Sequence, residues 1–416
     1  MEAMFTPTRA AALDALEGFL PHAGRDYARD RNHDNGFERT NVSHLSPYLR
    51  HRLLTEREVV AAVLARHRLP DCEKFVQEVF WRTYWKGWLE QNPEVWRRYR
   101  REVGEFWLDD DAVSADYHHA VGGRSGIEAM DAWVTELVDT GYLHNHTRMW
   151  FASIWIFTLR LPWQLGADFF YRHLLDGDAA SNTLSWRWVA GLQTAGKTYL
   201  ATAENISRYT DGRFAPTGLA TSTRALTEDP LPSRSTIPVA DQLPPVHRVG
   251  LLLHEEDLDA ASLGHDHPWF DSEVHELKTG HSAVDVVATA AYADPADRSP
   301  ARVSDTVRAF TEGALEDAAS RAGVSAARPA TVLPDALAST VLRWAETERL
   351  DAVVVPAAPV GPVQERLATL RSALASEGLT MTTLTRRWDA LAWPHASRGF
   401  FAFRERIPAL LNQQGL

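Results

Sequence analysis

The first 215 residues carry apolar positions at helical spacing. Apolar side chains three and four residues apart form one face of an amphipathic helix. In the opening segment, Thr6 suits an N-cap position and Pro7 suits a first turn, ahead of an apolar stripe that ends at Leu20. Strand-like alternation is scarce throughout this part. The pattern therefore predicts an all-α half, with further helices around residues 55–67, 72–90, 127–140, 146–160 and 166–175.

The pattern changes after residue 215. Residues 216–246 are rich in Pro, Ser and Thr and have no sustained period, which is typical of a linker or an extended wrapping segment. From His247 onward, short apolar runs alternate with helical patterns, and this order predicts a parallel sheet covered on both faces. Strands are expected at residues 249–253, 284–288, 330–333 and 352–355, and helices at 300–322, 337–348 and 361–377.

These patterns predict an α+β multidomain chain. An all-α helical domain would span residues 1–215, a linker residues 216–246, and an α/β parallel-sheet domain of the Rossmann-like type residues 247–416. The chain has 416 residues, of which 45% are hydrophobic, so both domains can bury a sizeable core.

Composition narrows the function classes. A single cysteine, Cys72, excludes a disulfide framework and any cysteine-rich metal site. The net charge is −12, and neither half of the chain is basic, so a surface that binds nucleic acid must be a local patch. The most apolar run, 149–159, is shorter than the roughly 20 residues of a membrane span. The first residues lack the pattern of a secretory signal, so we expect a cytoplasmic protein without membrane contact.

Four segments hold residues of the types that bind ligands or take part in catalysis. DGDAASNTLSWRW at 176–188 holds two aspartates at i and i+2, a spacing that predicts a turn leading into a helix. EVFWR at 78–82 lies in an aromatic-rich helix, and GYLHNHTRM at 141–149 opens the apolar helix. Earlier in the chain, Tyr27 precedes NVSHLSPYL at 41–49. In order and spacing, over about 190 residues, these four segments resemble the FAD-binding domain of the DNA photolyase and cryptochrome family.

The resemblance implies that FAD is held, folded into a U, inside a helical bundle. Ser43 and Ser46 match positions at the phosphates, where hydroxyls and free N–H groups suit an anion. Asp176 matches a residue beside the flavin ring and Arg148 its ion-pair partner, while Asn182 matches the residue that faces flavin N5. The positions that match cofactor contacts are Tyr27, Ser43, Leu45, Ser46, Arg148, Asp176, Asp178 and Asn182.

The resemblance also implies a substrate, a cyclobutane pyrimidine dimer in UV-damaged DNA. A flipped dinucleotide needs apolar faces to stack on and polar groups for its edges. The matching positions are Glu78, Trp81, Arg82, Asn145, Met149 and Trp188. The implied activity is light-driven electron transfer by a carbon–carbon lyase of the deoxyribodipyrimidine photo-lyase type. The expected catalytic residues are Glu78, Asn145, Asn182, Trp186 and Trp163.

Some positions depart from the family pattern. Photoreduction in the family uses three tryptophans, and Trp186 and Trp163 match the inner and middle ones, but Ala120 stands at the outer position. Trp150 or Trp155 is the expected substitute.

Other departures concern DNA. His146 replaces an arginine expected to contact DNA phosphate, another expected arginine is missing near Ala201, and Thr83 stands where glutamate is common. These losses weaken the expected DNA binding. Two alternatives therefore stay open: a cryptochrome-like photoreceptor, and a flavoenzyme that uses the same fold without repairing DNA.

The α/β region follows the FAD-binding segment, whereas an α/β antenna domain precedes it in ordinary photolyases. The end of the chain, RRWDALAWPHASRGFFAFRERIPALL, is similar to the end of an antenna domain, so a circularly permuted order is expected. Antenna-binding signatures and a glycine-rich nucleotide fingerprint are absent from the sequence, so no antenna pigment is expected. His265-Asp266-His267 has no third ligand at suitable spacing, and we expect a turn there and no metal.

Overall fold

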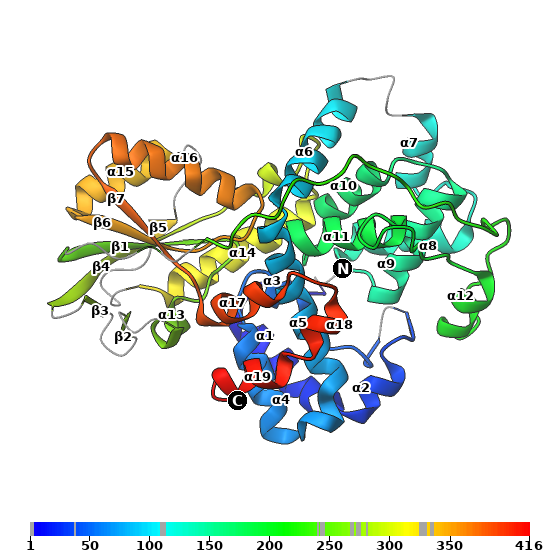
Figure 1. Ribbon diagram of the computed structural model, residues 1–416, viewed down its shortest axis with the longest axis horizontal. Coiled ribbons are helices and arrows are strands. Elements are labelled where there is room, and N and C mark those ends of the chain that lie inside the picture. Colours follow the sequence, from blue (N-terminus) through cyan, green and yellow to red (C-terminus); the bar gives the residue numbers. More distant parts are fainter. Residues whose placement is uncertain are drawn as a thin grey trace.

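The computed structural model describes residues 4–36, 39–108, 114–238, 241, 246–266, 270–271, 276–279, 282–323, 331–332 and 337–416. The described part up to residue 215 is helical, as expected (Figure 1). Its helices are α1 (Arg9–Phe19), α2 (Arg25–Asp30), α3 (Ser46–Arg50), α4 (Glu56–Arg66), α5 (Leu69–Gln91), α6 (Pro93–Leu108), α7 (Ala115–Val121), α8 (Glu128–Thr140), α9 (Asn145–Ser153), a π-helix (Ile154–Thr158), α10 (Trp163–His173), α11 (Ala179–Ala190) and α12 (Ala203–Tyr209).

Local sequence explains where several of these helices begin. Thr8, and not Thr6, caps α1, because the Thr8 side chain accepts a hydrogen bond from the Ala11 amide; the expected cap was two residues too early. Thr55 and Glu58 form a reciprocal capping box at the start of α4. These caps satisfy amide groups that a helix leaves without partners.

The second half contains one mixed sheet. Its parallel part has the strand order β5-β4-β1-β6-β7, which is 3-2-1-4-5 when these strands are numbered along the chain. That order is the Rossmann, doubly wound arrangement, and the expected fold class is confirmed. The strands are β1 (Arg248–His254), β2 (Phe270–Asp271), β3 (Glu276–Thr279), β4 (Ser282–Tyr292), β5 (Thr331–Val332), β6 (Ala352–Pro356) and β7 (Thr380–Leu384).

Two features of the sheet differ from the expectation of a purely parallel sheet with four strands. β2 and β3 form an antiparallel extension on β4, and β7, which sequence patterning missed, forms the edge beyond β6. His265 and Asp266 are the last residues of a helix, α13 (Ala260–Asp266), so the expected turn is wrong for these two; His267 lies outside the described residues. Among the described residues, no group of acidic, histidine and cysteine side chains suits a metal ion.

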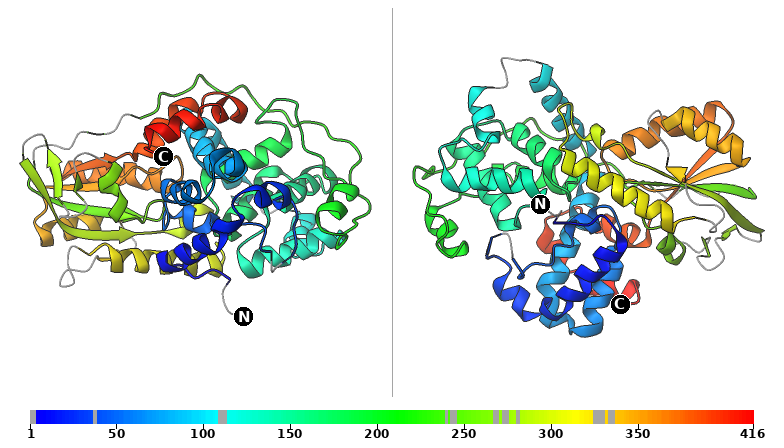
Figure 2. Two further views of the ribbon diagram at one scale, coloured as in Figure 1. Left: turned by 90° about the horizontal axis from the view of Figure 1, so that it is seen from below. Right: turned by 180° about the vertical axis from the view of Figure 1, so that it is seen from behind.

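Helices cover both faces of the sheet (Figures 1 and 2). α15 (Leu337–Glu348) and α16 (Pro362–Ser376) pack on the face that includes Leu252 and Val353. α14 (Asp305–Arg321) packs on the opposite face, where Leu251 and Leu253 join the core of the helical half. Neighbouring residues of β1 thus point into different cores, as the period of two in a strand requires.

The chain returns to the helical half after β7. The last helices are α17 (Arg387–Ala392), α18 (Phe400–Arg404) and α19 (Ile407–Gln413), of which α17 and α18 lie against α5 (Figure 1). Trp388 stacks on Phe80 with ring centroids 4.6 Å apart, and its Nε1 donates to Thr83 Oγ1 at 2.9 Å. A larger side chain at Gly87 would meet Trp393, since an added Cβ would come within 2.8 Å of it. Helices from both ends of the chain therefore share one core, and the division at residues 215 and 246 stays a prediction. No helix of the described residues is long and apolar enough to cross a membrane.

Candidate functional site

Asp176 and Asp178 lie in a tight turn that leads into α11. Asp178 is the N-cap of that helix, and its Oδ1 accepts from the Ser181 amide at 2.7 Å. Gly177 between them is packed closely, because an added Cβ would come within 3.1 Å of the Leu174 carbonyl oxygen. The spacing of the two aspartates thus produces the turn and helix start that the sequence predicts.

Asp176 is paired with Arg148 of α9 in a two-pronged ion pair. Arg148 Nη1 and Nη2 donate to the two carboxylate oxygens at 3.0 and 2.9 Å. Burial alone would raise the pKa of Asp176, but Arg148, Arg82 and a hydrogen bond from Ser46 outweigh burial and hold the pKa below its usual value. Asp176 is therefore a carboxylate at neutral pH, although it is only 4% exposed.

Asp178 is paired with Arg82 of α5, which also donates to the Asp176 carbonyl oxygen at 3.2 Å. Burial opposes ionisation of Asp178, yet Arg82 and Lys86 lower its pKa. Each carboxylate oxygen has two lone pairs, so both aspartates can still accept a hydrogen bond from a ligand. The turn therefore presents two buried, ionised acceptors held by cations.

Asn182 lies one turn into α11, and its amide orientation is fixed by the backbone. Its Nδ2 donates to the Ala167 carbonyl oxygen at 2.8 Å, and only the nitrogen end of an amide can donate to a carbonyl. The Oδ1 end is therefore the one that remains to accept a hydrogen bond from a ligand. A ligand would therefore meet this oxygen with an N–H group and not with an unprotonated ring nitrogen.

The residues expected at the phosphates lie near the start of α3. Ser46 is its first residue and bonds Asp176, Ser43 Oγ accepts from the Leu45 amide at 3.4 Å, and Leu45 is buried in the core. Leu45 thus supports this segment by packing. Asn41, which precedes them, has a buried Oδ1 without a partner in the described structure. Sequence reasoning quoted Asn41 in the motif but assigned it no role.

Tyr27 on α2 is buried between aromatic rings. Its ring meets Phe75 edge-on, with centroids 5.2 Å apart, and Arg31 lies 6.0 Å from the ring centroid. Burial and the nearby Glu78 raise the pKa of Tyr27, so the hydroxyl stays protonated at any physiological pH. Arg31 also forms an ion pair with Glu78 of α5, which links α2 to the expected lesion-binding residues.

The expected lesion-binding residues come from α5, α9 and α11 and differ in exposure. Asn145, the first residue of α9, is exposed, and Met149 is half-buried. Trp188 stacks on Tyr199 with centroids 5.7 Å apart. Trp81 is half-buried and stacks almost parallel on Phe400 of α18, with centroids 3.5 Å apart. One face of Trp81 is thus already covered by the C-terminal segment.

His146 does not present a cation where the resemblance leads us to expect a phosphate-binding arginine. Its Nδ1 lies 3.0 Å from the Asn32 carbonyl oxygen, and its ring stacks on Trp150 with centroids 4.5 Å apart. Burial lowers the pKa of His146, so the ring is neutral at physiological pH. Ala201 is also buried, at 2% exposure. Neither position presents a cation to solvent.

Comparison with known proteins identifies this arrangement. Residues 75–213, which include both aspartates, match the family model described as the FAD binding domain of DNA photolyase. This part of the chain resembles the FAD-binding domain of the photolyase/cryptochrome family. The resemblance that the sequence predicts is thereby confirmed for these residues.

Relatives named deoxyribodipyrimidine photo-lyase match part of the chain. The one from Streptomyces griseus is 36% identical over 155 residues, which cover 37% of this chain and 33% of the relative. One from Thermus thermophilus is 34% identical over 191 residues, covering 45% and 43%. The class III photolyase of Agrobacterium tumefaciens aligns in structure with 28% identity and a TM-score of 0.43, covering 50% of this chain and 43% of that one. The matches span less than half the length of each of these proteins.

The residues present at the turn fit FAD. The two aspartates and the Asn182 oxygen are acceptors, and Arg148 and Arg82 supply positive charge beside them. The orphaned Asn41 oxygen offers a further acceptor. Buried polar groups are normally hydrogen-bonded, so an unpaired acceptor in a photolyase-type domain suits a ligand group.

The expected photoreduction residues lie in an aromatic cluster. Trp186 contacts Trp155 with centroids 6.2 Å apart, and Trp155 contacts Tyr117 at 5.8 Å. Tyr117 in turn contacts the half-buried Trp107 at 6.0 Å. Trp163 stacks on Tyr99 instead, at 5.8 Å. Trp186, Trp155, Tyr117 and Trp107 therefore form an aromatic arm, the Trp155 arm, that leads from the core to the protein surface.

The Trp150 and Ala120 positions do not extend this arm. Trp150 stacks on Trp133, with centroids 5.7 Å apart, and Ala120 is buried in α7.

A cavity of about 1200 Å³ lies between α6, the residues around Arg160 and the segment 222–229. Of the expected site residues, Trp163 lines this cavity. The cavity is thus on the side of the middle tryptophan and away from the aspartate turn.

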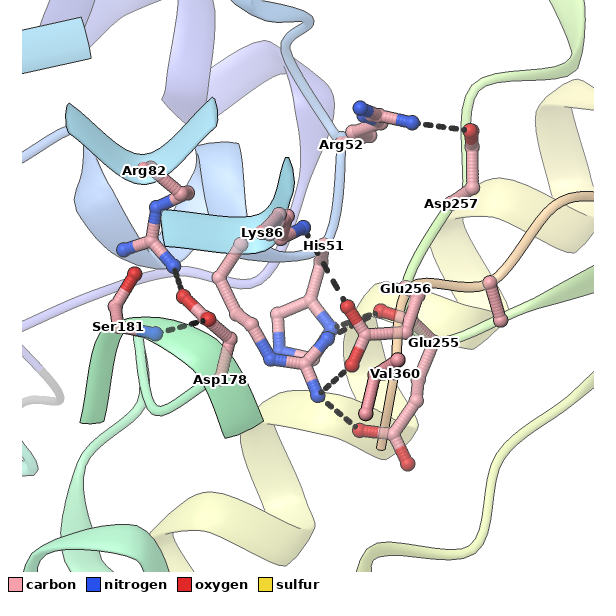
Figure 3. A network of polar contacts seen from close by, with 12 residues as sticks. His51, Arg52, Arg82, Lys86, Asp178, Ser181, Glu255, Glu256, Asp257 and Val360 are labelled. Carbon is pink, nitrogen blue, oxygen red and sulfur yellow. Dashed lines mark hydrogen bonds and ion pairs between the residues drawn. The ribbon is translucent and has the colours of Figure 1, made fainter. Parts of the chain in front are cut away.

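The turn is joined to the α/β region through Arg50, next to the Lys86–Glu256 and Arg52–Asp257 contacts that Figure 3 shows. Arg50 Nε donates to the Gly177 carbonyl oxygen at 2.8 Å, and its Nη2 lies 2.9 Å from Glu255 and 3.0 Å from Glu256. Lys86 lies 3.6 Å from Glu256. Glu255 and Glu256 follow directly after β1, so the carboxyl end of the sheet docks onto the flavin-binding half.

Proposed function

We propose that the protein is a FAD-dependent photolyase that splits cyclobutane pyrimidine dimers in DNA. The observation that carries the proposal is the convergence of α5, α9 and α11 on the Asp176–Asp178 turn, within a segment that matches the photolyase FAD-binding domain. Relatives of that segment are named deoxyribodipyrimidine photo-lyase. The substrate, UV-damaged DNA, and a cytoplasmic location are parts of the proposal.

FAD, when bound, would supply a light-excited electron donor. Asp176 and Asp178 would accept hydrogen bonds from the cofactor, and Arg148 would hold Asp176 ionised. Trp81 and Trp188 would provide stacking faces for the flipped dimer, and Glu78 and Asn145 would bind its edges. One electron would enter the dimer, the two carbon–carbon bonds that join the pyrimidines in the cyclobutane ring would break, and the electron would return. No net oxidation or reduction occurs.

The aromatic arm suggests how the cofactor would be kept reduced. An external thiol would donate one electron at Trp107, and the electron would move through Tyr117 and Trp155 to Trp186. This route makes Trp155 the substitute for the outer tryptophan that Ala120 replaces. Trp163, the matched middle residue, stacks on Tyr99 in a separate branch.

An illuminated repair assay tests the proposal. Reduced, FAD-loaded protein is mixed with an oligonucleotide that contains one thymine dimer, and a matched sample is kept dark. Restoration of the 260 nm absorbance of intact thymines in the light alone is the expected result. If the absorbance does not recover although the flavin is bound and reduced, the proposed reaction is wrong.

The Arg50 contact favours a light-responsive signalling protein as a second candidate. Arg50 touches both the aspartate turn and Glu255 at the end of β1, so a change at the cofactor has a direct path to the α/β region. This candidate predicts that light changes proteolysis of the segment 216–238 without repair of DNA. Identical cleavage patterns in dark and light would exclude it. Arg50→Met should abolish a genuine light effect while FAD stays bound.

A further inference from the structure

The C-terminal helix α18 and its flanks expose aromatic and basic groups together. Phe401 is 74% exposed, and the guanidinium group of Arg404 lies 5.5 Å from its ring centroid. Arg398 and Arg406 are exposed as well. Within the part of the chain that the structure describes, none of these three arginines has a carboxylate within salt-bridge distance. The segment 398–406 contains one acidic residue, Glu405.

This exposed group lies beside the expected lesion-binding residues. Phe400, the neighbour of Phe401, covers one face of Trp81. The Tyr84 hydroxyl, on the next turn of α5, donates to the Arg398 carbonyl oxygen at 2.8 Å. The segment 398–406 is therefore anchored on the helix that carries Glu78 and Trp81.

The charge of this surface contrasts with that of the whole chain. The protein carries a net charge of −12, and neighbouring arginines without acidic partners are unfavourable unless an anion compensates them. The linker adds a further exposed cation, Arg234, which acts electrostatically on Tyr84. Nucleic acid pairs a regular row of phosphates with unstacked bases that bind to exposed aromatic rings. An exposed phenylalanine surrounded by arginines complements both features.

We propose that residues 398–406 form the DNA-binding surface beside the lesion pocket, in place of the arginines that His146 and Ala201 replace. Arg398, Arg404 and Arg406 contact phosphates on the strand that flanks the flipped dimer. Phe401 stacks on a base left unpaired by the flipping. This inference rests on the proposed photolyase function, and it assigns the C-terminal segment of the chain a direct part in substrate binding.

Fluorescence anisotropy with a dimer-containing duplex, over a series of salt concentrations, tests the surface. Each lost phosphate contact reduces the slope of log affinity against log salt by about one. The triple variant with alanine at Arg398, Arg404 and Arg406 should therefore lose about three units of slope. The preference for damaged over undamaged duplex should stay unchanged, because phosphate contacts carry no sequence information.

A matched control removes three exposed arginines elsewhere. Arg308 of α14, and Arg343 and Arg349 in and after α15, are exposed on the α/β half, and changing all three to alanine alters the net charge equally. The control variant should show nearly the same slope of log affinity against log salt as the wild type. Phe401→Ala should lower affinity about tenfold without a change of slope, since stacking is not ionic.

The outcomes separate this inference from the proposed function. If the wild type binds damaged duplex and both triple variants lose the same slope, the surface is wrong and the photolyase proposal stands. If the wild type shows no salt-dependent binding, both fail. The four substituted positions of the surface are exposed or half-exposed, so circular dichroism and FAD content should match the wild type and exclude misfolding as the cause.

Discussion

Glu90 should make the stability of the protein fall as the pH rises towards neutrality. It is 4% exposed on α5, and its Oε1 accepts from the Val360 amide at 2.5 Å in the loop after β6. Burial raises the pKa of Glu90 from 4.5 to about 7, an effect that the hydrogen bonds from Val360 and Gln364 reduce but do not cancel. The carboxyl group thus binds a proton more tightly in the folded protein than in the unfolded chain.

The direction and size of this change in stability follow from the linkage between proton binding and folding. Between about pH 4.5 and pH 7 the folded state holds a proton that the unfolded state has lost, so stability decreases with rising pH in this window. A difference of about 2.5 pKa units corresponds to about 3 kcal/mol, lost in full above pH 7. Glu90→Gln keeps an oxygen acceptor for the Val360 amide and removes the titration. The variant should match the wild type near pH 4.5 and exceed it by about 3 kcal/mol at pH 8.

Urea unfolding of both proteins at half-unit steps from pH 4.5 to pH 8 measures this difference. Glu377→Gln, at an exposed position after α16, serves as the control for replacing a carboxyl group by an amide. The reasoning is refuted if the Glu90→Gln difference is the same at every pH. A constant gain would mean that the amide packs better and that the carboxyl group does not titrate in this range.

Three further predictions concern the flavin site. Arg148→Met leaves the buried Asp176 without its main partner and should lower stability by about 3 kcal/mol, with loss of the 450 nm flavin absorbance, whereas Arg148→Lys should retain part of both. Trp155→Phe should slow photoreduction of oxidised flavin at least tenfold without changing FAD content, and an unchanged rate would rule out the Trp155–Trp186 arm. Titration should give one FAD per chain, because the one described flavin-type site is at the aspartate turn; a ratio of two would require a second site.

Sequence reasoning succeeded where chemistry is local. The turn at Asp176–Asp178 and the start of α11 follow from side chains within three residues of each other. The helical periods predicted the bounds of α4, α5, α8 and α10 to within three residues but missed short helices such as α2 and α12. The pairing of Arg148 with Asp176 spans 28 residues, and the resemblance to a known family supplied it. Roles of individual residues in binding FAD or DNA stay predictions.

Local sequence patterns did not predict the contacts between segments that are far apart in the chain. Trp388 is 305 residues from Thr83, and its bond explains why a hydroxyl suits the position where glutamate is common in the family. A glutamate there would be larger and would bury a charge beside Phe80, where Thr83 is fully buried. The stacking of Phe400 on Trp81 is of the same kind. Neither periodicity nor motif spacing could reveal these contacts, since each depends on how α17–α19 fold back.

Contacts between distant segments also decide whether a ligand can bind at the carboxyl end of the sheet. In doubly wound sheets, ligands bind where the strand order reverses, here between β1 and β6. Arg50 and Arg298 reach Glu255 at this point, and Arg52 and Arg386 reach Asp257.

Burial would raise the pKa of Glu255 and of Asp257, but these arginines outweigh burial and lower both. A ligand between β1 and β6 would have to separate buried ion pairs, and breaking one such pair costs about 3–5 kcal/mol. The acidic run after β1 is therefore better understood as the interface that orients the α/β half on the flavin-binding half than as a pigment site. That interface also holds α17, because Arg52 bonds Asp389 of α17 at 2.6 Å, and the chain that follows α17 brings Phe400 of the segment 398–406 onto Trp81.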